Sequence, residues 1–240
     1  KTDLREILSS QAGITLGTGE NGNAFGDRYV IRGHEARSDV FVDGIRDPGM
    51  TTRESFAAEQ VEITKGPSST FAGRGSSGGA VNTITKAATV DEDFTILDAS
   101  IGTDEYYRVP IDSNLQIGTD AALRVNALTA SEDIPDRDGL TRERNGLLLS
   151  GYLNLNDSWN LIADAYYLEA DDVPDLGSYF DREKREPVED IPVYSQNNDF
   201  LDTEVLSTTL RLNGEINAKW RASASLRYGT TENDYITTGV

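Results

Sequence analysis

The 240-residue chain has no cysteine, one histidine and one methionine. It also has no run of about 20 apolar residues, the length that a membrane-spanning helix needs. Without cysteine, a disulfide framework and a thiolate metal site are excluded. The single histidine, His34, cannot form a nitrogen-rich metal site alone, so no metal site is predicted. The opening residues Lys1 to Leu4 show no signal-peptide pattern and lead directly into a helix-like segment.

The charge is strongly acidic and unevenly distributed. The formal net charge is −19, from 41 Asp and Glu against 22 Lys and Arg. Residues 1–88 hold 11 acidic and 10 basic residues (10 − 11 = −1), whereas residues 89–240 hold 30 acidic and 12 basic ones (12 − 30 = −18). An acidic chain lacks the basic face that neutralises phosphates, which argues against nucleic acid as a partner. The shift predicts two domains, 1–88 and 89–240, with the boundary near Ala87-Ala88-Thr89.

The second part alternates apolar and polar residues over segments of about ten residues, the pattern of strands in a membrane β-barrel. In the last segment, for example, Trp220, Leu226 and Tyr228 fall on one face, and Arg221 and Arg227 fall on the other. About seven such segments occur, at 94–101, 107–117, 122–130, 147–155, 159–168, 205–218 and 219–229. Alternation alone also fits a soluble β-sandwich with its apolar face turned inward.

Two further features favour a membrane barrel over a secreted sandwich or adhesin. Trp159 and Tyr167 share a face, as do Trp220 and Tyr228. A separation of eight residues spans roughly 26 Å of strand, which after the tilt of the strand is close to the spacing of the two aromatic girdles of a membrane barrel. The connections are also unequal: three are short, at 118–120, 156–158 and 217–218, and two are long and polar, at 131–144 and 170–204. Because an open sheet edge in lipid leaves backbone groups unpaired, further strands are expected elsewhere in the full protein.

The first part is predicted to be a compact α+β unit with glycine-rich loops. Asp3 can cap a short helix with Glu6 at its third position. A second short helix is expected near Thr52. Short strands are expected at 29–32, 40–42, 61–64 and 80–85.

Five blocks of this unit resemble, in order and spacing, the plug of TonB-dependent siderophore receptors. They are Tyr29-Val30-Ile31-Arg32-Gly33, Phe41-Val42-Asp43-Gly44, Glu59 to Pro67, Phe71-Ala72-Gly73 and Gly78-Gly79-Ala80-Val81-Asn82. The stretch Asn23 to Arg28 resembles the branch that imports iron–catecholate complexes. The resemblance implies an α+β plug domain followed by antiparallel transmembrane β-barrel strands, in a chain that begins inside the plug and lacks the family's energy-coupling motif.

This resemblance also implies a function, which is active import of a ferric siderophore across the bacterial outer membrane. The inner-membrane TonB complex supplies the energy, and outer-membrane lipid surrounds the barrel. The iron travels in the chelate, so no cofactor is expected, and no enzyme activity is implied. Iron–catecholate is the preferred cargo and iron–hydroxamate the second. The alternatives are a receptor for another nutrient, such as cobalamin or a glycan, and a secreted β-rich binding protein.

Plug loops expected to face outward carry candidate contacts for an anionic iron chelate. Arginine suits such a ligand because it is permanently charged, offers several donors and stacks on aromatic rings. The candidates are Phe25, Arg28, Arg37, Arg46, Met50 and Arg53, with Tyr179 and Phe180 where related receptors place aromatic contacts. The alternative interpretation pairs each arginine with a neighbouring Asp27, Asp39, Asp47 or Glu54. Loop 170–204 is otherwise acidic, with 11 Asp and Glu against three bases, and its role is left open.

Three further charges match positions that in relatives hold the plug to the barrel wall. They are Arg32, Glu62 and Lys65, and their partners would lie on later strands; a solvated salt bridge is the alternative. The glycine-rich stretches 17–22 and 73–78 match a dinucleotide-binding spacing, but neither joins a strand to a helix, so a nucleotide-dependent enzyme is set aside.

Overall fold

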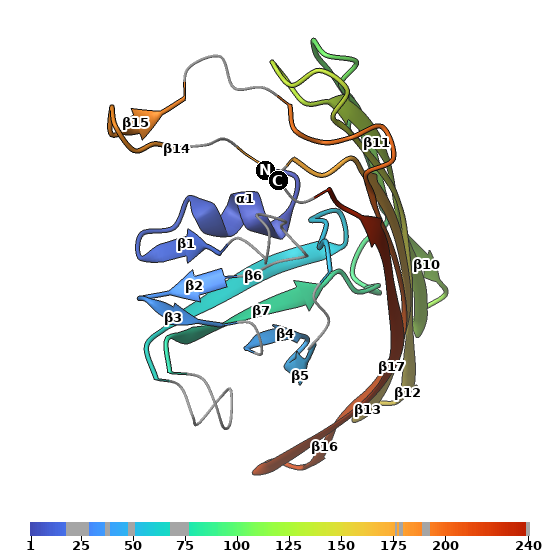
Figure 1. Ribbon diagram of the computed structural model, residues 1–240. Helices are drawn as coiled ribbons and strands as arrows, with labels where there is room; N and C mark the ends of the chain where they lie inside the picture. Colours follow the sequence, from blue (N-terminus) through green and yellow to red (C-terminus); the bar gives the residue numbers. More distant parts are fainter. Residues whose placement is uncertain are drawn as a thin grey trace.

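The computed structural model describes residues 1–17, 29–36, 39–47, 51–67, 77–175, 177, 180–188 and 193–238. An N-terminal α+β domain, called the plug below, lies against one face of a strongly curved antiparallel sheet of long strands, called the wall (Figure 1). Among the described residues, no helix is long and apolar enough to cross a membrane.

The plug opens with helix α1 (Leu4–Ser9), which begins where the sequence predicts. The Asp3 carboxylate accepts a hydrogen bond of 2.7 Å from the amide of Glu6, and the Glu6 carboxylate accepts one of 3.0 Å from the amide of Thr2. This reciprocal arrangement satisfies amides that a helix start leaves free. Leu4 and Leu8 are buried on the helix face that meets the plug core.

Two small sheets complete the plug. The first contains β1 (Ile14–Leu16), β2 (Tyr29–Ile31) and β3 (His34–Glu35) in that order. The second contains β4 (Val40–Val42), β5 (Ile45–Arg46), β6 (Ala58–Lys65) and β7 (Gly79–Thr85) in the order β5-β4-β7-β6, with β4 and β7 parallel. Buried apolar side chains from both sheets and from α1 form one core, including Leu8, Tyr29, Ile31, Val40 and Val81.

The predicted second helix near Thr52 is wrong. Residues 51–57 form an extended segment and a turn, because Glu54 makes an isolated antiparallel bridge with Asp3. The amide of Leu4 donates to the carbonyl of Arg53 at 2.9 Å, and the amide of Ser55 donates to the carbonyl of Thr2 at 3.0 Å. These long-range bonds use backbone groups that a local helix would have paired.

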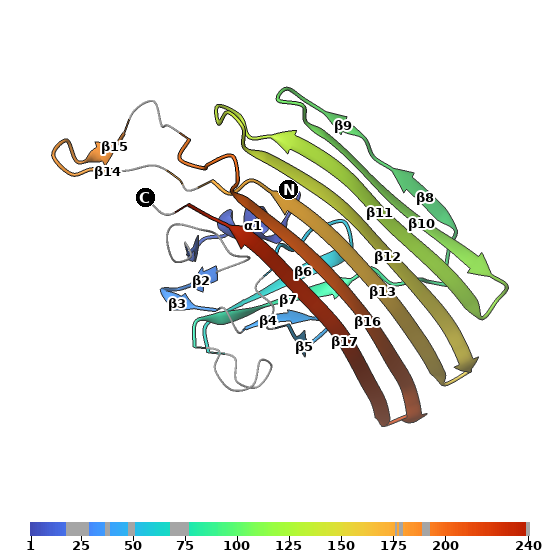
Figure 2. The same ribbon diagram turned by 45° about the vertical axis from the view of Figure 1, so that its right-hand side comes forward.

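The wall is an eight-stranded antiparallel sheet in which neighbouring strands follow the chain order. Its strands are β8 (Phe94–Leu97), β9 (Ser100–Ile101), β10 (Tyr107–Ile117), β11 (Ala121–Asp133), β12 (Thr141–Asn156), β13 (Trp159–Asp172), β16 (Phe200–Asn217) and β17 (Trp220–Ile236). β8 and β9 both pair with β10 and correspond to one predicted strand, so the seven predicted strands are confirmed. A small hairpin of β14 (Phe180–Asp181) and β15 (Glu186–Pro187) lies in the connection between β13 and β16 (Figure 2).

Several wall strands extend further than the alternation predicts. β11 continues to Asp133, β13 continues to Asp172 and β16 starts at Phe200, so the long connections shorten to 134–140 and 173–199. The additional residues are mostly polar or acidic, and they continue the backbone ladder beyond the apolar band. The end of the wall with these connections is called the loop end; the end with the short connections 118–120, 157–158 and 218–219 is called the turn end.

The two faces of the wall differ as the alternation predicts. One cross-strand row lies on the face turned away from the plug and consists of Ile111, Ala127, Leu147, Tyr167 and Leu206. The neighbouring row faces the plug and consists of Asp112, Asn126, Leu148, Tyr166 and Ser207. Leucines of the first row are exposed, whereas Asp112, Asn126, Leu148 and Ser207 are buried under the plug. An apolar outer face and a polar inner face are the arrangement of a barrel wall in lipid.

Candidate functional site

Charged side chains of the plug meet charged side chains of the wall at three places. Each is named here after its plug carboxylate: the Glu54 cluster (Glu54, Arg108, Arg144, Asp172), the Glu59 cluster (Glu59, Lys86, Asp112, Arg124) and the Asp43 cluster (Asp43, Asp164, Arg211). The four arginines project from β10, β11, β12 and β16 toward the plug. The interface is therefore the part of the molecule where charge is most concentrated away from water.

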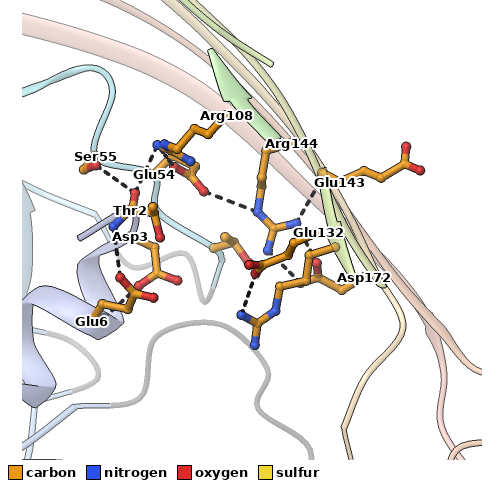
Figure 3. Close-up of polar contacts among 12 residues, drawn as sticks. Thr2, Asp3, Glu6, Glu54, Ser55, Arg108, Glu132, Glu143, Arg144 and Asp172 are labelled. Atoms are coloured by element: carbon orange, nitrogen blue, oxygen red, sulfur yellow. Dashed lines mark hydrogen bonds and ion pairs between the residues drawn. The ribbon is translucent and has the colours of Figure 1, made fainter. Parts of the chain in front are cut away.

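The Glu54 cluster lies near the loop end of the wall (Figure 3). Arg108 contacts one Glu54 oxygen at 2.7 Å, and Arg144 Nε approaches the other at 3.4 Å. Arg144 also donates to Asp172 at 2.9 Å, and Arg108 donates to the carbonyl of Thr2 at 3.4 Å. Figure 3 shows how these side chains converge between the start of α1 and the wall.

Glu54 is buried, with 4% of its side chain exposed. Burial raises the pKa of the Glu54 carboxyl, and the guanidinium groups of Arg108 and Arg144 offset part of that rise. The desolvation penalty of a buried ion pair can exceed its Coulombic gain, so such a pair fixes geometry more than it adds stability. We therefore assign this cluster the role of positioning the 51–55 segment against β10 and β12.

The Glu59 cluster lies beside the linker that joins the two domains. Arg124 makes two bonds of 2.8 Å to the Asp112 carboxylate and reaches Glu59 at 3.1 Å. Lys86 binds the same Asp112 at 3.0 Å, and Arg124 also donates to the carbonyl of Ala87 at 3.0 Å. This bidentate geometry fits the planar fork of arginine and would be lost with lysine.

Uncharged side chains of the wall hold the rest of this linker. The amide of Ala88 donates to Ser150 Oγ at 3.1 Å. Asn114 accepts from the amide of Thr89 at 3.0 Å and donates to the carbonyls of Thr89 and Glu92 at 2.9 and 2.6 Å. The backbone between β7 and β8 is thus bonded to β10 and β12 along its path.

The Asp43 cluster lies toward the turn end. Asp43 occupies the tight turn between β4 and β5 with a φ of 52°, and its carboxylate accepts a 2.9 Å bond from the amide of Thr85. Arg211 of β16 contacts Asp43 at 3.2 Å and Asp164 of β13 at 2.6 Å. One guanidinium therefore links the plug to two neighbouring wall strands.

An apolar contact lies between the Glu54 and Asp43 clusters. Phe56 is 5% exposed and packs in a cluster with Ala57, Leu128, Ala130, Leu148, Leu168 and Val205. Its ring stacks on Tyr166 with centroids 5.8 Å apart, and a Cβ built on Gly146 would lie 2.5 Å from it. Only glycine at 146 lets the ring approach the wall so closely.

A cavity of about 790 Å³, measured to its opening, separates the plug from β13, β16 and β17 next to this apolar contact. Hydroxyl groups line it from both sides, from Thr83 and Thr85 on the plug and from Ser207 and Thr209 on the wall. Asp164 of the Asp43 cluster also contributes to its lining. Within the described part of the chain, no group of three or more His, Asp or Glu side chains could hold a metal ion.

Three of the predicted ligand contacts fall on described residues. Arg46 pairs with Asp39 at 3.1 Å and lies 5.0 Å above the centroid of the Phe41 ring, and Arg53 pairs with Asp47 at 3.1 Å. Both arginines have the acidic neighbours that the alternative interpretation gives them. Phe180 starts the β14–β15 hairpin and is 59% exposed. Phe25, Arg28, Arg37, Met50 and Tyr179 lie outside the described residues, and the ligand-binding role of the whole set stays a prediction.

The predicted plug–wall charges Arg32, Glu62 and Lys65 make contacts inside the plug. Glu62 accepts a 2.9 Å bond from Asn82, and Lys65 donates to the carbonyl of Ala12 at 2.7 Å. Arg32 follows β2 in an exposed turn with a φ of 51°, rather than lying within a strand as expected. The β2–β3 hairpin lies on the side of the plug away from the wall in both ribbon views. Their pairing with later strands stays a prediction.

An amphipathic antiparallel wall with a charged α+β domain bonded to its polar face is the arrangement of a plug domain against the first strands of a membrane β-barrel. The family model "TonB-dependent Receptor Plug Domain" matches residues 1–80. The chain belongs to the TonB-dependent receptors, with a plug followed by the first strands of the barrel. Membership of a receptor family agrees with the expectation that the chain is not an enzyme.

Individual relatives match nearly the whole length of this chain. Probable TonB-dependent receptor BfrD of Bordetella pertussis is 34% identical over 99% of this chain and 33% of its own length. The crystal structure of siderophore receptor PiuA from Acinetobacter baumannii has a TM-score of 0.91 at 34% identity, covering 98% of this chain and 35% of that one. The ferric-catecholate import receptor Fiu of Escherichia coli K12, closed form, has a TM-score of 0.88 at 28% identity, with coverage of 98% and 35%. The chain therefore spans about a third of the length of the relatives it matches.

Proposed function

We propose that the complete receptor imports ferric siderophores across the outer membrane with energy from TonB, and that an iron–catecholate chelate is the cargo. The observation that carries this proposal is the plug held on the polar face of the wall by three charge clusters, in two of which the plug carboxylate, Glu54 or Asp43, is buried. A pore wide enough for an iron chelate must be closed at rest and opened only transiently. Buried ion pairs suit this requirement because they define one closed geometry without making it exceptionally stable.

The choice of catecholate follows from chemistry and from similarity. A ferric catecholate is an anion with aromatic rings, and arginine binds both features. Arg46 lies over the Phe41 ring and beside the Asp39 carboxylate, so the aromatic rings and negative charge of a chelate would take the place of partners of the same chemical kinds. Fiu, at 28% identity, is described as a ferric-catecholate import receptor. We propose that Arg46, Arg53 and Phe180 contact the chelate together with the predicted residues outside the described ranges.

We also propose two features of the complete receptor. Arg32, Glu62 and Lys65 face wall strands other than the eight described here. The domain boundary lies at 88/89, within the linker between the end of β7 at Thr85 and the start of β8 at Phe94.

Radio-iron uptake by a receptor-deficient host expressing the full-length gene tests the proposal. Catecholate and hydroxamate chelates are supplied separately, with a protonophore in a parallel arm. Protonophore-sensitive uptake of the catecholate alone is the expected result. Uptake of the hydroxamate alone would keep the importer and change its cargo. No uptake of either chelate by correctly inserted receptor would remove iron from the proposal, and cobalamin and glycan competition would follow.

A further inference from the structure

We propose that the plug parts from the wall along β13, β16 and β17 while it stays attached to β10, β11 and β12, so that the cavity on that side begins the import route. The inference rests on the proposed function as an importer. It adds which side of the plug opens and which ion pair closes the route at rest.

The attached side is defined by covalent and polar connections. The plug continues through residues 86–93 into β8, which pairs with β10, so the chain itself ties the plug to this side of the wall. Ser150 of β12 and Asn114 of β10 bind the backbone of the same linker. Arg124 of β11 bonds the linker carbonyl of Ala87 and the plug carboxylate of Glu59. A movement that began here would have to break all of these bonds together.

The Glu54 contacts strengthen the same side. Glu54 is held by Arg108 of β10 and by Arg144 of β12. The Phe56 ring lies over Gly146 of β12 and also stacks on Tyr166 of β13, so the apolar contact marks the border between the attached side and the opening side.

The opposite side already has space between plug and wall. The cavity described above lies on this side, and its volume of about 790 Å³ includes the open space at its mouth. Hydroxyls of Thr83 and Thr85 face those of Ser207 and Thr209 across it. Apolar side chains such as Val42, Val61 and Val205 make up much of the remaining lining. A chelate with aromatic rings would therefore meet apolar contacts together with a few weak, exchangeable hydrogen bonds, and weak multiple sites allow a solute to enter and leave.

The Asp43 cluster lies at the turn end of this cavity. Along β16 the inward residues run from Val205 through Ser207 and Thr209 to Arg211, so the Arg211–Asp43 bond follows the hydroxyl-lined stretch. Arg211 keeps its 2.6 Å bond to Asp164 on the wall if Asp43 moves away. Breaking the plug–wall bond therefore leaves Arg211 paired, while Asp43 keeps the bond from the Thr85 amide and gains water as the plug moves away, which suits a contact that must open and reform.

Reversible cross-links in the full-length receptor test the inference. The 240 residues given contain no cysteine, and any cysteine elsewhere in the receptor is first replaced by serine. Asp43→Cys with Arg211→Cys places a thiol pair on the proposed opening side, and Glu59→Cys with Arg124→Cys places one on the attached side. The two pairs are matched, since each replaces a plug carboxylate and a wall arginine in contact at 3.2 and 3.1 Å. A reducible bifunctional thiol reagent joins each pair in cells, and uptake and binding of the ferric catecholate are measured before joining, after joining and after reduction.

We expect the 43–211 cross-link to lower uptake to the level of protonophore-treated cells, with chelate binding retained and uptake restored by reduction. We expect the 59–124 cross-link to leave uptake at its value before joining. Block by the 59–124 link, or transport through the 43–211 link, would overturn the inference. Absence of uptake by the unmodified receptor would instead remove the proposed function.

Two further pairs keep the test decisive if loss of an ion pair alone impairs a variant. Thr85→Cys with Ser207→Cys spans the same cavity and leaves the ion pairs in place. Ala88→Cys with Ser150→Cys joins the linker to β12, where the wild-type contact is 3.1 Å. The first link is expected to block uptake and the second is not, and the reverse pattern would overturn the inference.

Discussion

Replacement of Phe56 by alanine should loosen the plug from the wall more than any other single truncation at the apolar contact. The side chain is buried among apolar wall residues, and Gly146 beneath the ring has no side chain that could fill the vacated space. Truncating a buried phenylalanine costs about 3–5 kcal/mol. Since each 1.4 kcal/mol is a factor of ten, the population in which the plug is detached locally should rise roughly 100- to 4,000-fold.

Native-state hydrogen exchange of the full-length receptor measures this population. The informative amides are those of Ala88 and Thr89, which donate to Ser150 and Asn114 of the wall. Their protection should fall in Phe56→Ala by the factor given above. Phe180→Ala is the matched control because Phe180 is exposed, and protection should be unchanged in it. Equal protection in Phe56→Ala and wild type would refute the assignment of Phe56 as the apolar anchor.

A second substitution separates packing from a general loss of stability. Gly146→Val alone should cost about 1–3 kcal/mol by overpacking against the Phe56 ring. Combined with Phe56→Ala, the valine occupies part of the vacated space, so the double variant should be more protected than the sum of the single effects predicts. Strict additivity would show that the two residues do not share this space.

Three other predictions concern single sites. Burial raises the pKa of Glu54, so the stabilisation that its carboxyl gives to plug attachment is fully present below the ordinary carboxyl pKa and is lost as pH rises through the raised value. Amide protection in the wild type should therefore decline over that pH window relative to Glu54→Gln. Parallel pH profiles of the two proteins would contradict this. A Cβ at Gly214 would lie 2.2 Å from the Trp159 ring, so Gly214→Ala should shift the indole and change its fluorescence emission in a Trp220→Phe background; an unchanged spectrum would place the ring elsewhere. Asp3→Ala removes the cap of α1 and should cost about 1 kcal/mol of stability, whereas Asp3→Asn should cost little. Hydrogen exchange of the Glu6 amide, which donates to the Asp3 carboxylate, measures this cost.

The wall could be predicted from the sequence because its signal is local. Every second residue faces lipid, so alternation located the strands and assigned Arg227 to the inner face, where it lines the cavity between plug and wall. Strand ends were predicted too short, since the acidic residues up to Asp172 carry no apolar pattern although their backbone continues the ladder. The alternation of apolar and polar residues reflects the surroundings of the side chains, so it does not mark a strand whose two faces are both polar.

The interface could not be predicted in the same way because its contacts join distant residues. Glu54 was considered only as a neighbour of the plug arginines, yet its partners are Arg108 and Arg144, which lie on wall strands. A usable signal existed, since a charge on the inner face of a strand needs a partner. The sequence does not say which plug carboxylate supplies it, and the extended segment at Thr52 depends on the bridge from Glu54 to Asp3 rather than on local propensity.

The short linker between β7 and β8 has a consequence for how the barrel closes again. Residues 86–93 join the plug to the wall covalently, and their backbone bonds to Asn114 and Ser150 lie on the attached side. A displaced plug then stays tethered to the polar face of the wall that it binds, and short tethers give effective concentrations in the millimolar range. Rebinding of such a plug is intramolecular, so its rate does not depend on the density of receptors in the membrane.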